Sequence, residues 1–230
     1  MKMTWAQTLP ASAYARAISS TAEIDAAANQ LARIREQYQV TSVAAAGARD
    51  RIIKSWERCR SMSLDPKANA PVIRADTEEL RAASELLVRA ADPILALLTD
   101  ALADTGYLVI LADACGLVLN VAGELRARLS AADVGVVPGA DWSEASAGTN
   151  AVGTAIADRR AIQLLAGEHF CDAPQNLTCT GAPIYMPEGR EIGAVLAVTG
   201  NYRLVRSQLI DVVMQGALDV EDQLSASLRY

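Results

Sequence analysis

The sequence predicts an α+β fold in which helices flank a single antiparallel sheet. Residues 107–111 and 117–121 are short apolar runs on either side of an Asp-Ala-Cys-Gly turn, which is a hairpin pattern. Residues 180–186 and 192–199 form a second such pair across Pro-Glu-Gly. The long helical patterns lie before the first hairpin and after the last, so the strands do not alternate with helices as in a parallel sheet.

The first predicted helix covers residues 20–39. Ser20 followed three residues later by Glu23 is a capping-box pattern. Apolar residues then recur at steps of three and four, which predicts a helix that packs against another part of the chain, and they are Ile24, Ala27, Leu31, Ile34 and Tyr38. Residues 41–47 are a predicted linker of small residues.

The second predicted helix covers residues 48–62 and ends at Leu64-Asp65-Pro66, because proline disfavours the helical conformation of the residue before it. Its apolar face carries Ile52, Ile53, Trp56 and Cys59. The same helix carries a basic run, which we interpret as a solvated helix face, and its members are Arg49, Arg51, Lys54, Arg58 and Arg60.

A third helical pattern starts at Asp76, where Glu79 completes a capping box, and ends before Gly106. Pro93 is expected to kink or split it. Between the two hairpins we expect a short helix over 124–129, a loop over 134–139 and a third strand over 161–165. The last helix begins near residue 204, and its apolar stripe is Val205, Leu209, Val212, Val213, Gly216, Val220 and Leu224.

Composition excludes several classes of function. The 230 residues carry a net charge of −6, which argues against binding a nucleic-acid backbone with this chain. No run approaches the about 20 apolar residues of a membrane helix and no secretory signal is seen, so a cytoplasmic protein is expected. The four cysteines include no Cys-x-x-Cys pair and predict no disulfide framework.

Residues 141–156 are the expected binding region. Hydroxylated and small residues surround the amide of Asn150, and a run of small residues follows it at helical spacing. Asn150 and Thr149 have an alternative role as caps of a helix entry, and Trp142 an alternative role as a core residue. No Arg or Lys lies between Trp142 and Ala157, which favours a neutral or weakly polar ligand. The expected ligand-binding residues, including three from later motifs, are Trp142, Ser146, Thr149, Asn150, Thr154, His169, Phe170 and Cys179.

Four motifs in this order resemble the GAF sensory domains of bacterial sigma-54-dependent (Fis-family) activators, of the acetoin-catabolism and dihydroxyacetone-operon type. The motifs are Trp142 with Ala147-Gly-Thr-Asn-Ala-Val-Gly-Thr-Ala155, Gly167-Glu-His-Phe170, Cys179-Thr-Gly-Ala-Pro-Ile184, and Ile192-Gly193 with Thr199-Gly200. Together with a matching segment around Trp56, the resemblance runs from about Arg49 to the C-terminus. It implies a GAF fold and a non-enzymatic sensor that binds a small effector or a protein partner; the dihydroxyacetone-operon relatives dock kinase subunits.

The resemblance also implies a division of the chain. We expect an N-terminal helical extension over 1–47, a helical lead-in over 48–105, the GAF core over 106–203 and a signalling helix over 204–230. Residues 76–104 and 204–228 are more apolar on one side than a single sheet requires, so we expect them to form a homodimer. An ATPase domain and a DNA-binding domain follow the sensor in such activators, and no phosphate-binding Gly-x-x-x-x-Gly-Lys loop is present here.

Two other functions stay open. A GAF-fold thiol oxidoreductase, similar to enzymes that reduce free methionine sulfoxide, would use Cys115, Cys171 and Cys179. A haem or metal sensor would use His169, the single histidine, with neighbouring cysteines. We expect neither catalysis nor a bound metal or cofactor. One histidine and no Gly-x-Ser-x-Gly turn exclude nucleophile triads. His169 and the nearby cysteines have no clean zinc-ligand spacing.

Overall fold

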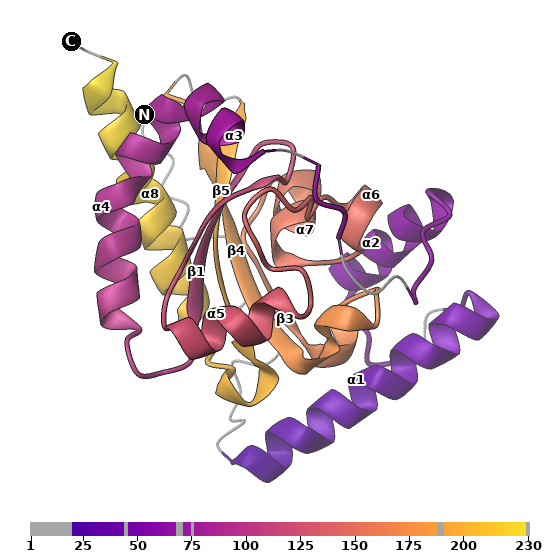
Figure 1. Ribbon diagram of the computed structural model, residues 1–230. Coiled ribbons are helices and arrows are strands. Elements are labelled where there is room, and N and C mark those ends of the chain that lie inside the picture. Colours follow the sequence, from indigo (N-terminus) through magenta and orange to yellow (C-terminus); the bar gives the residue numbers. More distant parts are fainter. Residues whose placement is uncertain (1–19, 44–45, 68–70, 75, 188–190, 229–230) are drawn as a thin grey trace, which may run out of the picture.

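A five-stranded antiparallel sheet forms the middle of the molecule in the computed structural model (Figure 1). The model describes residues 20–43, 46–67, 71–74, 76–187 and 191–228. The strand order is β2-β1-β5-β4-β3, and every pairing is antiparallel. The strands are β1 (Leu108–Asp113), β2 (Val118–Ala122), β3 (Ile162–Leu165), β4 (Leu177–Tyr185) and β5 (Ile192–Asn201). Both predicted hairpins and the third strand are therefore present.

Helices cover both faces of this sheet, because alternate residues of each central strand point to opposite sides. Helices α4 (Glu85–Ala101) and α8 (Leu209–Ser227) pack on one face and against each other. Helix α7 (Ala151–Asp158) lies on the other face, with the short α6 (Glu144–Ala147) beside it. Figure 1 shows these two helical layers on opposite sides of the strands. In β5, Val195 and Ala197 belong to the α7-side core, whereas Leu196 and Val198 belong to the α8-side core.

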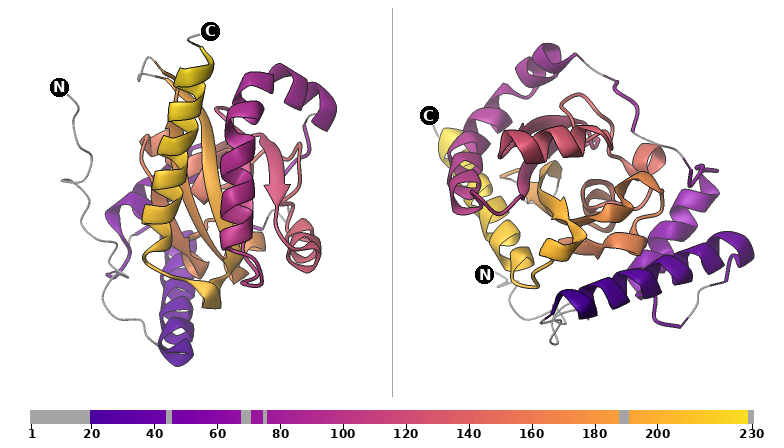
Figure 2. Two further views of the ribbon diagram at one scale, coloured as in Figure 1. Left: turned by 90° about the vertical axis from the view of Figure 1, so that its left-hand side faces the viewer. Right: turned by 60° about the horizontal axis from the view of Figure 1, so that its bottom comes forward.

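The N-terminal part of the chain packs against the α7 side of the molecule. Helix α1 (Thr21–Thr41) begins with the predicted capping box, in which Ser20 accepts from the Glu23 amide and Glu23 accepts from the Ser20 amide. Helix α2 (Asp50–Ser61) follows, and its Trp56 and Cys59 are buried as expected. Figure 2 shows α1 extending along the base of the molecule, where it contacts the 3₁₀ turn η2 (Ala166–Glu168).

The third predicted helix is divided, but not at the proline. Helix α3 (Thr77–Ala83) ends at Ser84 and α4 starts directly after it, whereas Pro93 lies inside α4. Buried residues on both sides of the proline, Ala90, Ala91, Leu95 and Leu98, pack on the sheet and hold α4 in one piece. Asp76 caps α3 as expected, with Oδ1 accepting from the Glu78 and Glu79 amides.

The remaining elements connect the strands. Helix α5 (Leu125–Ala132) lies between β2 and α6, and it buries only Ala131. The turn η3 (Ala173–Asn176) precedes β4, and the turn η4 (Tyr202–Leu204) follows β5. Helix α8 therefore starts at Leu209, five residues after the predicted start near residue 204. No helix within the described residues has the length and apolarity needed to cross a membrane.

Candidate functional site

The amide of Asn150 caps α7. Its Oδ1 accepts from the Val152 and Gly153 backbone amides, both at 2.9 Å. Its Nδ2 donates to the Trp142 carbonyl at 2.9 Å and to the Gly148 carbonyl at 2.8 Å. The side chain is 1% exposed, and both of its amide protons are bound to backbone groups. Asn150 therefore has the capping role that the sequence offered as the alternative to ligand binding.

The small residues of α7 allow close backbone contact, as the sequence predicts. A Cβ on Gly153 would lie 2.5 Å from the Glu144 amide nitrogen, and a Cβ on Gly181 of β4 would lie 2.4 Å from the Ala151 carbonyl oxygen. Neither position has room for a methyl group. This close packing leaves little space between α7 and the sheet.

One small cavity remains there. Its volume is about 20 Å³, enough for roughly one water molecule. Apart from Asn150, its wall is apolar except for Cys179 and Thr199, whose Sγ and Oγ1 atoms are 3.0 Å apart. The Thr199 hydroxyl also donates to the Thr178 carbonyl at 3.3 Å. The other lining residues are Ile110, Val118, Val136, Trp142, Ala151, Val152, Leu177 and Ala197.

Trp142 covers this cavity from the segment that joins β2 to α6. The indole is 5% exposed, and its Nε1 donates to the Gly135 carbonyl at 3.0 Å, so it is a core residue as the alternative interpretation held. Helix α5 lies in the same segment and packs loosely, because Leu125 and Leu129 are 69% and 62% exposed. In this α5–Trp142 segment the helix is therefore loosely packed, whereas Val136 and Trp142, which line the cavity, are buried.

A buried carboxylate organises the polar side of α7. Glu144 is 7% exposed and accepts two hydrogen bonds from Arg58, at 2.6 and 2.8 Å. It also accepts from the hydroxyls of Ser55 (2.5 Å) and Thr154 (2.8 Å). Because Ser55 donates its one proton to Glu144, the Thr149 hydroxyl is the donor in the 2.6 Å Ser55–Thr149 bond. Thr149 and Thr154 therefore join α7 to α2 and do not line the cavity.

Three arginines of the basic run form ion pairs. The interpretation as a solvated helix face is wrong for these three residues. Arg58 pairs with Glu144 and Asp158, Arg51 pairs with Asp158, and Arg49 pairs with Glu168. Hydrogen bonding to Glu144 raises the pKa of Arg58, whereas burial lowers the pKa of Arg51. These ion pairs attach α2 to Glu144 before α7, to Asp158 at the end of α7 and to Glu168 after β3.

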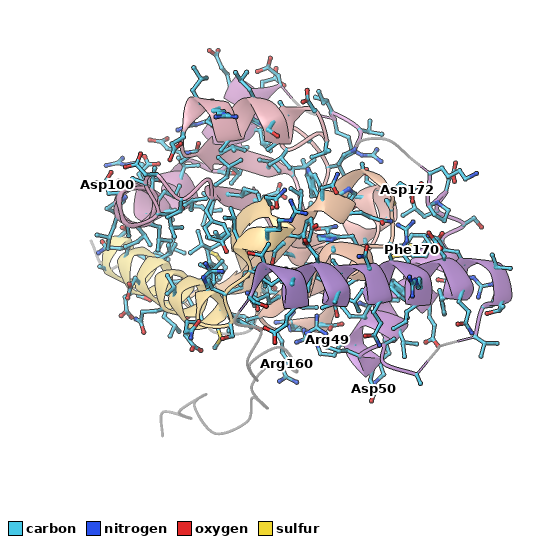
Figure 3. The ribbon with its side chains drawn as sticks, turned by 90° about the horizontal axis from the view of Figure 1, so that it is seen from below. Arg49, Asp50, Asp100, Arg160, Phe170 and Asp172 are labelled. Atoms are coloured by element: carbon cyan, nitrogen blue, oxygen red, sulfur yellow. The ribbon has the colours of Figure 1, made fainter. Side chains whose placement is uncertain are left out.

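Helix α1 holds the loop that carries His169 and Phe170. Arg35 is 5% exposed, pairs with Asp172 and donates to the Phe170 carbonyl at 3.2 Å. Figure 3 shows Phe170 and Asp172 on one side of α1 and Arg49 on the other. Glu168 is 1% exposed, and its two oxygens accept from Arg49 at 2.7 and 2.8 Å.

His169 is completely buried in this loop. Its Nδ1 lies 2.9 Å from the Ala166 carbonyl oxygen and so carries the proton, while Nε2 has no hydrogen-bond partner among the described residues. Burial lowers the pKa of the imidazole to about 4. His169 and Cys171 lie in an irregular loop between η2 and η3 and not in a strand. Within the described residues, no group of three His, Cys, Asp or Glu side chains is placed to hold a metal ion.

The thiols of the α7-side core are poor nucleophiles. Burial raises the pKa of Cys59 to about 11 and those of Cys171 and Cys179 to about 12. Cys115 is exposed in the β1–β2 turn. Since the thiolate is the reactive form, raised pKa values disfavour thiol chemistry at the buried positions.

The structure divides the expected ligand-binding residues into four places. Trp142, Asn150 and Cys179 meet at the α7 cavity, and Thr149 and Thr154 join the Glu144 network. His169 and Phe170 lie under α1. Ser146 lies elsewhere, in a void of about 10 Å³ beside Trp142 and Cys171, with its hydroxyl unpartnered among the described residues.

Four residues of these networks were absent from the expected set. Thr199 closes a quoted motif, and its place opposite Cys179 follows from the β4–β5 register. Ser55 and Arg58 lie three residues apart on one helix face, a spacing that indicates a shared contact. The sequence offers no comparable signal for Glu144, because its partners are about 90 positions away.

Comparison with known proteins places the chain in a family. Residues 27–222 match the model of the MimR N-terminal domain. The chain belongs to this family. The match begins within α1, at residue 27, and so before Arg49.

Named relatives of this family member are transcriptional regulators. The chain is 36% identical over 157 residues to the acetoin catabolism regulatory protein of Cupriavidus necator (66% of this chain, 23% of the relative). It is 31% identical over 196 residues to the propane 2-monooxygenase operon transcriptional activator MimR of Mycolicibacterium smegmatis (84% and 33%). The expected relation to acetoin-type activators is confirmed, and the chain spans about a quarter to a third of these relatives' length.

Among solved structures, the chain is similar to one in the crystal structure of the E. coli DhaR(N)–DhaL complex. The TM-score is 0.74 at 17% sequence identity, covering 78% of this chain and 62% of that one. At this identity the likeness shows the fold alone. It confirms the predicted GAF-like α+β architecture.

Proposed function

We propose that the chain is the non-enzymatic sensory domain of a transcriptional regulator, and that it binds a small neutral effector at the α7 cavity. The observation that carries this is the enclosed apolar cavity with one polar pair, Cys179 and Thr199, under the loosely packed α5–Trp142 segment. Membership of the MimR N-terminal domain family supports the regulatory role.

The cavity limits the chemistry of the effector. Its wall carries no charged side chain, so a charged ligand would be desolvated without a partner. One hydroxyl or carbonyl group of the effector hydrogen-bonds to Cys179 or Thr199 and replaces the bond between these two side chains. Since the volume of about 20 Å³ is smaller than any metabolite, the α5–Trp142 segment moves outward on binding.

The bound state is passed on through the helices on the opposite face. Exposed leucines on α4, Leu86 at 40% and Leu97 at 62%, form the contact of a homodimer in this proposal. The division into an extension, a lead-in, a core and a signalling helix remains a prediction within the same scheme. The raised pKa values of the buried Cys171 and Cys179 thiols disfavour the alternative of a thiol oxidoreductase.

A binding assay with acetoin and other neutral alcohols and ketones of three to six carbons tests the effector site. We expect indole fluorescence and the amide NMR signals of Cys179 and Thr199 to change on saturation. Ala197→Val adds two methyl groups at the cavity wall and is expected to weaken binding at least tenfold. Ala194→Val is the matched control, because Ala194 lies on the same strand but faces the α8-side core. Equal binding by both variants, or no response of the wild-type chain to the whole panel, contradicts the proposal.

A protein partner is the second candidate. It is favoured by Leu125 and Leu129, which are four residues apart on α5 and largely exposed. Exchanging both leucines for glutamine leaves effector binding intact and abolishes association with the partner if α5 is the docking surface.

A further inference from the structure

A cleft in the described part of the chain lies on the face opposite the α7 cavity. Its volume is about 330 Å³, within the range of small-molecule sites. It opens between α8 and the end of β4, next to the connection from α7 to β3. It is lined by Arg159, Arg160, Ala161, Ala182, Pro183, Tyr185, Met214, Ala217, Leu218 and Glu221.

Small residues create this space. Ala182 of β4 and Ala217 of α8 are both buried, and both line the cleft. One residue earlier in α8 the packing is tight, because a Cβ on Gly216 would lie 2.8 Å from Leu196. The apolar floor is completed by Pro183 and Met214. The cleft therefore has an apolar floor of the kind that accepts a hydrocarbon group.

Four polar or charged residues line the cleft. The Arg159 guanidinium lies 5.5 Å from the Tyr185 ring centroid, and the Tyr185 hydroxyl donates to the Arg159 carbonyl at 2.7 Å. Glu221 accepts from the Tyr185 amide at 2.9 Å. Arg160 is exposed, and no ion pair of its guanidinium is found among the described residues. Figure 3 shows Arg160 at the margin of the molecule.

We propose that this cleft is a second effector site, which binds a free amphipathic carboxylate with its hydrocarbon body between Ala182 and Ala217 and its carboxylate on Arg160. Charge complementarity favours an anion, because two arginines line the cleft and its one carboxylate, Glu221, already accepts from the Tyr185 amide. The ligand contacts both β4 and α8, so its binding changes how α8 sits on the sheet. The site is separate from the α7 cavity, and its existence does not depend on the effector proposed there.

Octanoate is the test probe, with octanol and octylamine as ligands of equal chain length. Isothermal titration at low salt is expected to show binding of octanoate, weaker binding of octanol and none of octylamine. The amide NMR signals of Met214, Ala217 and Leu218 are expected to shift, whereas those of Thr199 remain unchanged.

Two variants locate the site. Arg160→Gln removes the cation without changing the core, and it is expected to weaken octanoate binding about five- to tenfold, as for an ion pair of about 1 kcal/mol. Arg126→Gln, at an exposed arginine on α5, is the matched control and leaves binding unchanged. Ala217→Met fills the cleft and is expected to abolish binding of both octanoate and octanol.

Three results overturn the proposal. Octanoate binding that is equal in the wild type, Arg160→Gln and Ala217→Met places the probe elsewhere. Shifts at Thr199 in place of α8 assign the probe to the α7 cavity. Concentration-dependent shifts of the same α8 amides without any ligand assign the cleft to contact with a second copy of the chain.

Discussion

At the scale of single residues, His169 makes the stability of the domain depend on pH. Burial lowers the pKa of its imidazole from 6.5 to about 4. Between these values the unfolded chain binds a proton that the folded chain does not, so the contribution of His169 is complete above pH 6.5 and is lost progressively as the pH falls toward 4. Because this is the single histidine, no other imidazole titrates in this window.

We expect the free energy of unfolding to fall by on the order of 3 kcal/mol between pH 7 and pH 4 through this group alone. Urea denaturation at closely spaced pH values measures it. His169→Gln removes the titrating ring and should flatten the dependence between pH 6.5 and 5. An unchanged slope in this variant would show that His169 does not carry the effect.

Asn150 gives a second prediction at this scale. Its replacement by alanine removes the cap of α7 and leaves the buried Trp142 and Gly148 carbonyls without their donor. We expect a loss of about 3 kcal/mol, made up of about 1 for the cap and the remainder for the unpaired carbonyls. Asp76→Ala removes the exposed cap of α3 and serves as the control, with a loss of about 1 kcal/mol. Thermal or denaturant unfolding of both variants compares them, and equal losses would contradict the buried role of Asn150.

At the scale of the element, α1 depends on the absence of a side chain at Gly167. A Cβ there would lie 2.5 Å from the Ala32 nitrogen and 2.5 Å from the Leu31 carbonyl carbon of α1. Gly167→Ala is therefore expected to displace α1 at a cost of about 1–3 kcal/mol. Hydrogen exchange should accelerate in α1 and remain unchanged in α8.

Gly193→Ala is the control for this experiment. The Cβ in that case meets the flexible end of the Met186 side chain, which moves aside at little cost. Slow exchange in α1 of the Gly167→Ala variant would show that α1 tolerates the methyl group and is held mainly by Arg35.

Elements were largely predictable because their signals are local. The Ser20–Glu23 capping box, the Asp113–Gly116 turn and the apolar run of β1 depend on residues within a few positions of each other. The break at Ser84 instead of Pro93 was not predictable, because burial of residues on both sides of the proline decides it. Tertiary packing overrides the local preference there.

The candidate site was predictable only in part, for the same reason. Asn150 and Cys179 come from recognisable motifs, and the structure brings both to the α7 cavity. The pairing of Arg58 with Glu144 joins residues 86 positions apart, and no local pattern encodes it. The basic run of α2 looks like a solvated face in sequence for this reason, although three of its arginines are ion-paired.

At the scale of the whole molecule, the proposed homodimer makes a direct prediction. Leu97→Glu introduces a charge on the exposed side of α4 and is expected to weaken self-association at least tenfold. Leu129→Glu is the matched control, since Leu129 is also 62% exposed but lies on α5. Sedimentation equilibrium over a range of concentrations measures both. A wild-type chain that stays monomeric at high concentration removes the homodimer.

Strand β5 has a mechanical role that follows from its two faces. Ala197 and Thr199 form part of the cavity wall, while Leu196 and Val198, their immediate neighbours in the chain, support the helical layer of α4 and α8. A backbone displaced by an occupant on one side carries the residues of the other side with it. The cavity wall and the support of the helical layer therefore belong to the same strand. The stiffness of β5 determines how much of a displacement at the cavity reaches α4 and α8.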